Sequence, residues 1–150
     1  MKLSFALLLA AAFALPPAFA AAPVEGKHYT RLQVPQPTEA QGKVEVIEFF
    51  WYGCPHCADF EPLLKSWVKQ LPADVHFRKV PAVFNPTWGE GARLYYTFEA
   101  LGLLDRLNDA AFEAMTRQRI RLDDEKTLAE WIVKQGVDAK KFMEMYKSLT

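Results

Sequence analysis

Only two cysteines occur in the 150 residues, and neither sign of charge is in excess. Two cysteines cannot supply the several disulfides of a small cross-linked scaffold or the four thiolates of a zinc site. Lysine plus arginine number 18, as do aspartate plus glutamate, so no basic surface is indicated and no nucleic-acid partner is expected. Hydrophobic residues make up 51% of the chain. The composition is therefore that of a globular protein with a buried core, not of a disordered chain.

Long apolar stretches are absent except at the N-terminus. There Lys2 precedes an apolar stretch over residues 3–15, and Ala18 and Ala20 stand at the −3 and −1 positions of an export-peptidase site. The stretch is shorter than the ~20 residues that a membrane-spanning helix needs, which favours a cleaved signal peptide over residues 1–20 rather than an uncleaved anchor. An exported chain leaves the compartment where thiols are kept reduced, so its two cysteines can be oxidised.

Residues 44–51 and 75–80 have the composition of strands, and an amphipathic segment lies between them. The first segment is β-branched and aromatic, and the second alternates apolar and polar residues. Apolar residues of the segment between them recur at helical spacing, namely Phe60, Leu63, Leu64, Trp67, Val68 and Leu71. Two strands joined by a crossover helix predict a right-handed βαβ unit with parallel strands. We expect the first strand and this apolar helix face to be buried.

The second half of the chain has the pattern of helices. Apolar residues recur at helical spacing in four segments between residues 94 and 149. Gly102 and Gly136 follow two of these segments, at the position where glycine commonly ends a helix. Because stripes of this kind are normally core, the chain is predicted to be an α/β protein whose second half is helical.

Both cysteines lie at the junction of the first strand and the helix, in the sequence Cys54-Pro55-His56-Cys57. Pro55 suits the first helical position, where its fixed φ fits and its missing N–H is not needed. Cys54 is then the N-cap, where free N–H groups and the helix dipole favour a thiolate. His56 adds a hydrogen-bond donor, or a positive charge when protonated, beside the same sulfur. Cys57 follows one turn later, within reach of a disulfide to Cys54.

This position indicates a redox-active dithiol in which Cys54 forms a mixed disulfide with the substrate and Cys57 resolves it. Three other uses of the pair are less favoured. A structural disulfide would close too short a loop to stabilise much. A zinc site would need His28 or His76 as further ligands, and a c-type haem would need histidine where Ala58 stands. We therefore expect no metal, and no cofactor other than the Cys54–Cys57 disulfide itself.

Side chains near the pair are further candidates. Glu48 is predicted either to point into the core beneath the pair, as an unpaired carboxyl that relays protons to Cys57, or to lie on a solvated strand face. Trp51 and Tyr52 are predicted to form an apolar rim that docks unfolded polypeptide, with simple packing as the alternative. Glu61, one turn after Cys57, is predicted to be a surface charge.

The segment from Val46 to Glu61, which contains Cys-Pro-His-Cys, resembles the active-site segment of the DsbA-type thiol:disulfide interchange proteins. The tetrapeptide is specific to that group among thioredoxin relatives, and the export signal and helical second half also resemble it. The resemblance implies a thioredoxin-like α/β fold with an inserted α-helical domain. It also implies a stabilised Cys54 thiolate and a strongly oxidising couple, which are known properties of DsbA. By position, Glu48 and Glu61 match two acidic residues near the redox pair of that family.

The resemblance also divides the chain. We expect the signal peptide over residues 1–20, the N-terminal part of the thioredoxin-like domain over residues 21–84, and an incomplete inserted helical domain over residues 85–150. Family members continue with a helix, a strand entered by a cis-proline, a hairpin partner and a final helix. The C-terminal part of the fold is therefore expected to be missing from this chain.

The function implied by the resemblance is that of a periplasmic oxidase of a Gram-negative bacterium. Such a protein donates disulfides to unfolded or partly folded exported polypeptides and is reoxidised by a DsbB-type membrane quinone reductase. We expect a monomer. Two alternatives stay open, namely a non-catalytic peptide-binding fragment and a disulfide isomerase or reductase of the same fold.

Overall fold

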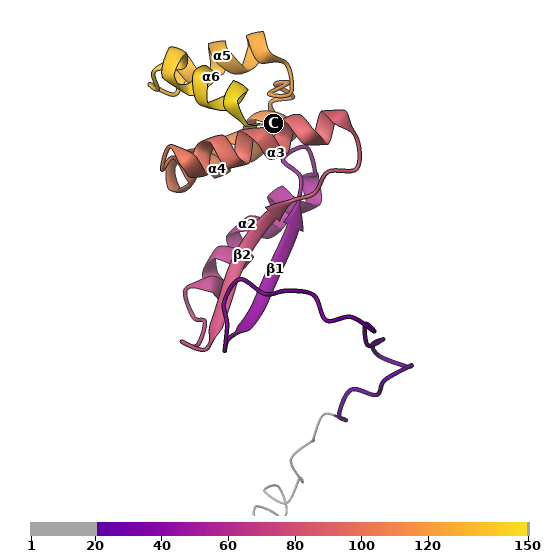
Figure 1. Cartoon of the computed structure of the whole chain (residues 1–150). Helices are drawn as coiled ribbons and strands as arrows, with labels where there is room; N and C mark the ends of the chain where they lie inside the picture. The colour runs from indigo at the N-terminus through magenta and orange to yellow at the C-terminus, as the bar shows by residue number, and fades with distance from the viewer. Residues whose placement is uncertain (1–20, 150) are drawn as a thin grey trace, which may run out of the picture. The chain divides into compact units, whose positions relative to one another are not determined.

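The structure is a computed structural model that describes residues 21–149 (Figure 1). The predicted signal peptide, residues 1–20, lies outside the described residues. The chain divides into two units, Met1–Pro37 and Thr38–Thr150. In the first unit, residues 21–37 are mostly irregular, with a turn in which the Gly26 N–H donates to the Tyr29 carbonyl at 2.8 Å. None of the helices within residues 21–149 has both the length and the apolar character needed to cross a bilayer.

The second unit begins with a βαβ arrangement. Strand β1 (Val44–Phe50) pairs in parallel with β2 (Val75–Pro81), and helix α2 (Pro55–Val68) connects them. The register sets Glu48 opposite Lys79. Figure 1 shows α2 running alongside the two strands. The predicted βαβ unit is confirmed, with a helix that ends at Val68, before the predicted Leu71.

Four further helices and one π-helical turn follow the sheet. They are α3 (Pro86–Ala100), α4 (Leu104–Phe112), the π-helical turn η2 (Glu113–Arg117), α5 (Glu125–Lys134) and α6 (Ala139–Ser148). The side chains of Asn85, Asp124 and Asp138 cap α3, α5 and α6 by accepting a backbone N–H of the first turn. Gly102 and Gly136 adopt positive φ after α3 and α5, as the sequence predicts.

The core of the second unit lies among these helices and the C-terminal end of β1. Figure 1 shows α3 to α6 grouped beyond the C-terminal ends of the strands. Aromatic rings fill much of this core in edge-on and tilted contacts, with Phe50 of β1 against Tyr95 of α3 and Phe112 of α4. The buried aromatic residues are Phe50, Tyr52, Tyr95, Phe98, Phe112, Trp131, Phe142 and Tyr146.

The predicted apolar face of α2 is covered much less than expected. Leu64 is buried, but Leu63 is 68% exposed, and Phe60 and Trp67 are exposed as well. These side chains border an apolar hollow between α2 and the strands. The buried stripe of α2 runs instead through Glu61 and Leu64, which face α4 and β2. The prediction of a buried helix face was therefore wrong for Phe60, Leu63 and Trp67, because within the described residues the sheet has two strands and the later helices cover a different side of α2.

Substitutions at two adjacent residues of α5 test how this helix packs in the core. Ile132 is fully buried, whereas its neighbour Val133 is exposed. We expect Ile132→Ala to lower the free energy of unfolding by about 2–5 kcal/mol, because it leaves a cavity among the helices. Val133→Ala, the matched control, should change it by less than about 0.5 kcal/mol. Urea denaturation of both variants measures the difference, and equal losses would contradict the packing of α5.

Candidate redox site

The two cysteines lie where the chain passes from β1 into α2. The Cys54 N–H donates to the Trp51 carbonyl at 2.9 Å, which closes a tight turn after the strand. Cys54 is the N-cap of α2, and its Sγ accepts a hydrogen bond from the Cys57 N–H at 3.4 Å. Both residues are half-buried free thiols. The predicted N-cap position of Cys54 and the first helical position of Pro55 are therefore confirmed.

Pro55 and His56 form the exposed outer side of this turn. Pro55 begins α2, and His56 follows on the solvent side, adjacent in sequence to both cysteines. An imidazole in this position is accessible to solvent and to a bound polypeptide. Its predicted effect on the Cys54 sulfur stays a prediction.

Cys57 has a different environment from Cys54. Burial raises the pKa of the Cys57 thiol to about 11, with smaller contributions from its hydrogen bond with Cys54 and from the charge of Glu48. Cys57 is therefore protonated near neutral pH. Before it can attack a mixed disulfide, it must give its proton to a base.

Glu48 lies on β1 with its side chain 10% exposed, near enough to Cys57 for its charge to raise the pKa of that thiol. The predicted core-facing orientation is confirmed, but the carboxyl is not unpaired, because Oε2 lies 3.0 Å from Lys79 Nζ. The contact is an ion pair whose geometry falls short of a hydrogen bond. Burial raises the pKa of Glu48 despite the attraction of Lys79.

Glu61 is buried, at 4% exposure, so the prediction of a surface charge was wrong. Its Oε1 forms a close ion pair with Lys79, and its Oε2 accepts a hydrogen bond from Asn108 Nδ2 at 3.4 Å. The burial of Glu61 could have been predicted from helical spacing, since Cys57, Glu61 and Leu64 fall on one face of α2. Lys79 and Asn108 were not identified from the sequence, because β2 and α4 bring them to the site from distant parts of the chain.

Tyr52 and Trp51 have different positions. Tyr52 is 1% exposed and donates its hydroxyl hydrogen to Asn108 Oδ1 at 2.9 Å, so the prediction that it forms a docking rim was wrong. Trp51 stacks on Trp88, with ring centroids 4.6 Å apart and an interplanar angle of 8°. Its ring lies over Gly53, where a Cβ would collide with the indole. A docking role is therefore left to Trp51 and stays a prediction.

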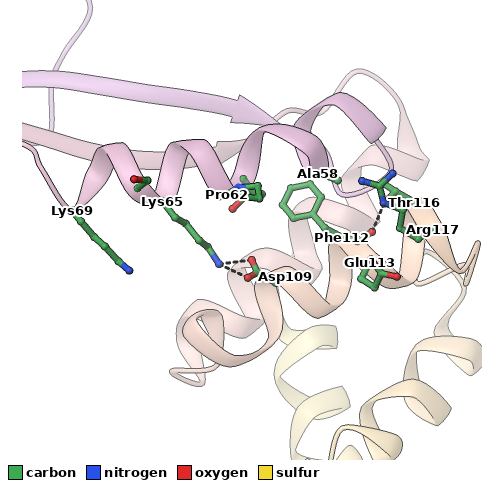
Figure 2. Close-up of a pocket in the computed structure, with 11 residues that line it drawn as sticks. Ala58, Pro62, Lys65, Lys69, Asp109, Phe112, Glu113, Thr116 and Arg117 are labelled. Carbon is green, nitrogen blue, oxygen red and sulfur yellow. Dashed lines mark hydrogen bonds and ion pairs between the residues drawn. The ribbon is translucent and has the colours of Figure 1, made fainter.

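A second hollow lies between α2 and the segment formed by α4 and η2 (Figure 2). Lys65 reaches across it to pair with Asp109, and Phe112 lies at its wall. Arg117 of η2 pairs with Asp59 of α2. The hollow is lined by Ala58 and Glu61 but by neither cysteine, so it borders the buried side of the redox site.

Comparison with known proteins identifies the family. No family model matches the chain. The chain is 42% identical over 152 residues to the thiol:disulfide interchange protein DsbA of Burkholderia cepacia, covering 99% of this chain and 72% of that relative. It is 41% identical over 123 residues to DsbA of Pseudomonas aeruginosa, covering 82% of this chain and 58% of that relative. The chain belongs to the family of DsbA thiol:disulfide interchange proteins.

Solved structures agree with this assignment to the DsbA family. The crystal structure of Pseudomonas aeruginosa DsbA superposes with a TM-score of 0.73 at 40% identity, covering 79% of this chain and 62% of that one. The oxidoreductase NmDsbA1 from N. meningitidis gives 0.70 at 38% identity, covering 84% of this chain and 67% of that one. The fold is thus the thioredoxin-like DsbA fold with a helical insertion, and the chemistry is that of a thiol:disulfide oxidoreductase. The chain spans between 58% and 72% of the length of the two curated relatives.

The raised pKa of Glu48 gives a testable pH dependence of stability. Because burial raises this pKa above the ordinary value of 4.5, the folded state holds the Glu48 proton more tightly than the unfolded state. As the pH rises from the ordinary value through the raised one, we expect the wild type to lose stability relative to Glu48→Gln. Urea denaturation at a series of pH values measures this difference.

Glu45→Gln, on the same strand, is the matched control with the opposite sign. A hydrogen bond from the Glu39 N–H holds the pKa of Glu45 below its ordinary value. The wild type should therefore gain stability relative to Glu45→Gln as the pH rises toward the ordinary value, and then stay level. The same sign of slope for both variants would contradict the assigned environment of Glu48.

Proposed function

We propose that the chain is a periplasmic dithiol oxidase that donates a disulfide to newly exported polypeptides through Cys54-Pro55-His56-Cys57. The observation that carries this proposal is the Cys54 sulfur at the N-terminus of α2, where it accepts the Cys57 N–H. Free N–H groups and the positive end of the helix dipole stabilise a thiolate there. A stabilised thiolate favours the reduced pair, and the same free energy makes the disulfide a strong oxidant.

The reaction is two successive thiol–disulfide exchanges. A substrate thiolate attacks Cys54 Sγ of the Cys54–Cys57 disulfide, which forms a mixed disulfide and releases Cys57 as a thiolate. A second substrate thiolate then attacks the substrate sulfur of the mixed disulfide, which forms the substrate disulfide and releases the Cys54 thiolate. Counted from its two thiols, the substrate loses two electrons and two protons. The cysteine pair gains the two electrons, Cys57 takes up one proton, and the other proton is released to solvent. The redox group is the cysteine pair itself.

Glu48 is proposed as the proton donor and acceptor for Cys57. A leaving Cys57 thiolate takes up a proton near neutral pH, because burial raises the pKa of this thiol to about 11. Burial also raises the pKa of Glu48, so this carboxyl holds a proton more readily than an exposed one. The charge of Glu48 in turn acts on Cys57, so proton and charge are exchanged between two groups that already interact.

The remaining parts of the proposal follow from the DsbA resemblance. Residues 21–84 are assigned to the N-terminal part of the thioredoxin-like domain and residues 85–150 to the inserted helical domain. A DsbB-type membrane quinone reductase is proposed to reoxidise the pair by accepting its two electrons. Unfolded or partly folded exported polypeptides are the proposed substrates, with Trp51 beside the redox pair as an aromatic contact, and the protein is proposed to act as a monomer.

Trapping experiments test the roles of the two cysteines. With an unfolded protein that carries a disulfide as substrate, Cys57→Ser is expected to accumulate a mixed disulfide, because Cys54 attacks the substrate disulfide and the resolving thiol of Cys57 is missing. Cys54→Ser should accumulate none. The adducts are measured by non-reducing electrophoresis and mass spectrometry. Adducts on Cys57 in the Cys54→Ser variant, at the level of Cys57→Ser, would contradict the proposed roles.

The direction of the reaction is tested by equilibrium with glutathione. We expect a reduction potential near that of DsbA, at about −120 mV, rather than that of thioredoxin, at about −270 mV. A potential near the thioredoxin value would favour the isomerase or reductase alternative. A wild type as inactive as Cys54→Ser in substrate oxidation would favour the peptide-binding fragment.

A further inference from the structure

A row of buried polar groups runs from Glu48, whose charge acts on Cys57, to helix α4. Glu48 of β1 contacts Lys79 of β2, Lys79 contacts Glu61 of α2, and Glu61 accepts from Asn108 of α4. The row ends at Tyr52, whose hydroxyl donates to the same asparagine. The proposed function uses Glu48 and Cys57, but it assigns nothing to the end of the row that lies on α4.

Asn108 uses both halves of its amide in this row and is 7% exposed. Its Nδ2 donates to Glu61 Oε2 at 3.4 Å, and its Oδ1 accepts from the Tyr52 hydroxyl at 2.9 Å. The orientation of the amide is determined, because a carboxylate accepts hydrogen bonds and would repel Oδ1. Burial raises the pKa of Tyr52 well above its ordinary value, so its hydroxyl stays a donor.

Lys79 is shared unequally between two carboxylates. It makes a close ion pair with Glu61, whereas its contact with Glu48 falls short of a hydrogen bond and leaves Glu48 Oε2 without a donor. One ammonium cannot balance two buried carboxylates, so one of them retains a proton more readily than the other. Glu61 has the closer contact with Lys79 and also the Asn108 donor, whereas Glu48 has only the weaker contact with Lys79, so Glu48 holds a proton more readily.

We propose that Asn108 is a positioning residue of the redox site, which holds Glu61 against Lys79 and thereby keeps Glu48 as the proton-carrying carboxyl near Cys57. This inference deepens the proposed function and rests on it for its biological meaning. It makes α4 part of the redox machinery, because the residue that determines the sharing of Lys79 comes from that helix.

The position of α4 on α2 agrees with this role. Asp109, the next residue, pairs with Lys65 one turn after Glu61 (Figure 2). Both partners of that pair are well exposed, so it contributes little to stability, but it lies beside the amide and fixes the same two helices. The titratable groups around the row are Cys54, Cys57 and Glu61 at α2, Glu48 of β1, Lys79 of β2, Tyr95 of α3, Asp109 of α4 and Tyr52.

The test is the titration of Glu48 in Asn108→Leu, a variant of similar volume without the amide. We expect the Glu48 midpoint to fall by about one pH unit, because Lys79 is released toward Glu48 when Glu61 loses its donor. Carbon NMR of the carboxyl groups in the reduced protein measures this midpoint without any turnover. This measurement of the Glu48 midpoint does not depend on oxidase activity, so a failure of the proposed function would be seen separately. An unchanged Glu48 midpoint in a folded Asn108→Leu would overturn the proposal.

Two further variants separate positioning from mere support of the fold. Asp109→Asn loosens the same helix pair but leaves the amide in place, and it should leave the Glu48 midpoint within about 0.2 pH unit of the wild type. An equal shift in Asp109→Asn would mean that α4 acts only structurally and would overturn the proposal. Tyr52→Phe removes the hydrogen bond to Asn108 Oδ1 but keeps the amide, and we expect a smaller fall of the Glu48 midpoint than in Asn108→Leu. It also keeps the proposal falsifiable if Asn108→Leu does not fold.

Discussion

The contact on which the site depends is the capping of α2 by a sulfur atom. The N-caps of α3, α5 and α6 are Asn85, Asp124 and Asp138, whose side-chain oxygen atoms are strong acceptors for the first N–H groups of the helix. Cys54 offers a weak acceptor in the same position, at 3.4 Å from the Cys57 nitrogen. The first turn of α2 also has no acidic residue. The positive end of this helix is therefore not offset by a carboxylate of its own first turn, and it faces the Cys54 sulfur.

The second consequence of this junction is the asymmetry between the two sulfurs. Cys54 lies at the helix terminus, whereas Cys57 lies one turn deeper, where burial raises its pKa to about 11. In the second exchange of the proposed reaction Cys54 is the leaving group, and a stabilised thiolate leaves more readily than an ordinary one. The protein then has to move a proton to and from the buried sulfur. We propose that Glu48, a carboxyl whose pKa is raised by burial, exchanges this proton with Cys57.

Local sequence signals predicted the local structure well. Pro55 after Cys54 predicted the N-cap. The β-branched and aromatic segment over residues 44–51 and the alternating segment over residues 75–80 predicted the parallel strands. The burial of Tyr52 could also have been predicted from the strand period of two. Residues 48, 50 and 52 share one face if the strand pattern continues past the end of β1, and Trp51 then lies on the other face. The partners of Glu48 and Glu61 could not be predicted in this way. Lys79 arrives through strand register and Asn108 through helix packing, and neither leaves a periodic signal near the cysteines.

Helix α4 contributes side chains that contact the buried polar groups near the redox pair. Lys79 Nζ lies 5.4 Å from the centroid of the Phe50 ring and 5.8 Å from that of Phe112, which comes from α4. These rings attract the ammonium, and a hydrogen bond in such a partly buried setting is electrostatically stronger than one in water. The same helix supplies Asn108 to the row. Without α4, Glu61 would lose the Asn108 donor and Lys79 would lose its contact with the Phe112 ring, so the βαβ unit alone would not hold these two side chains as they are held in the structure.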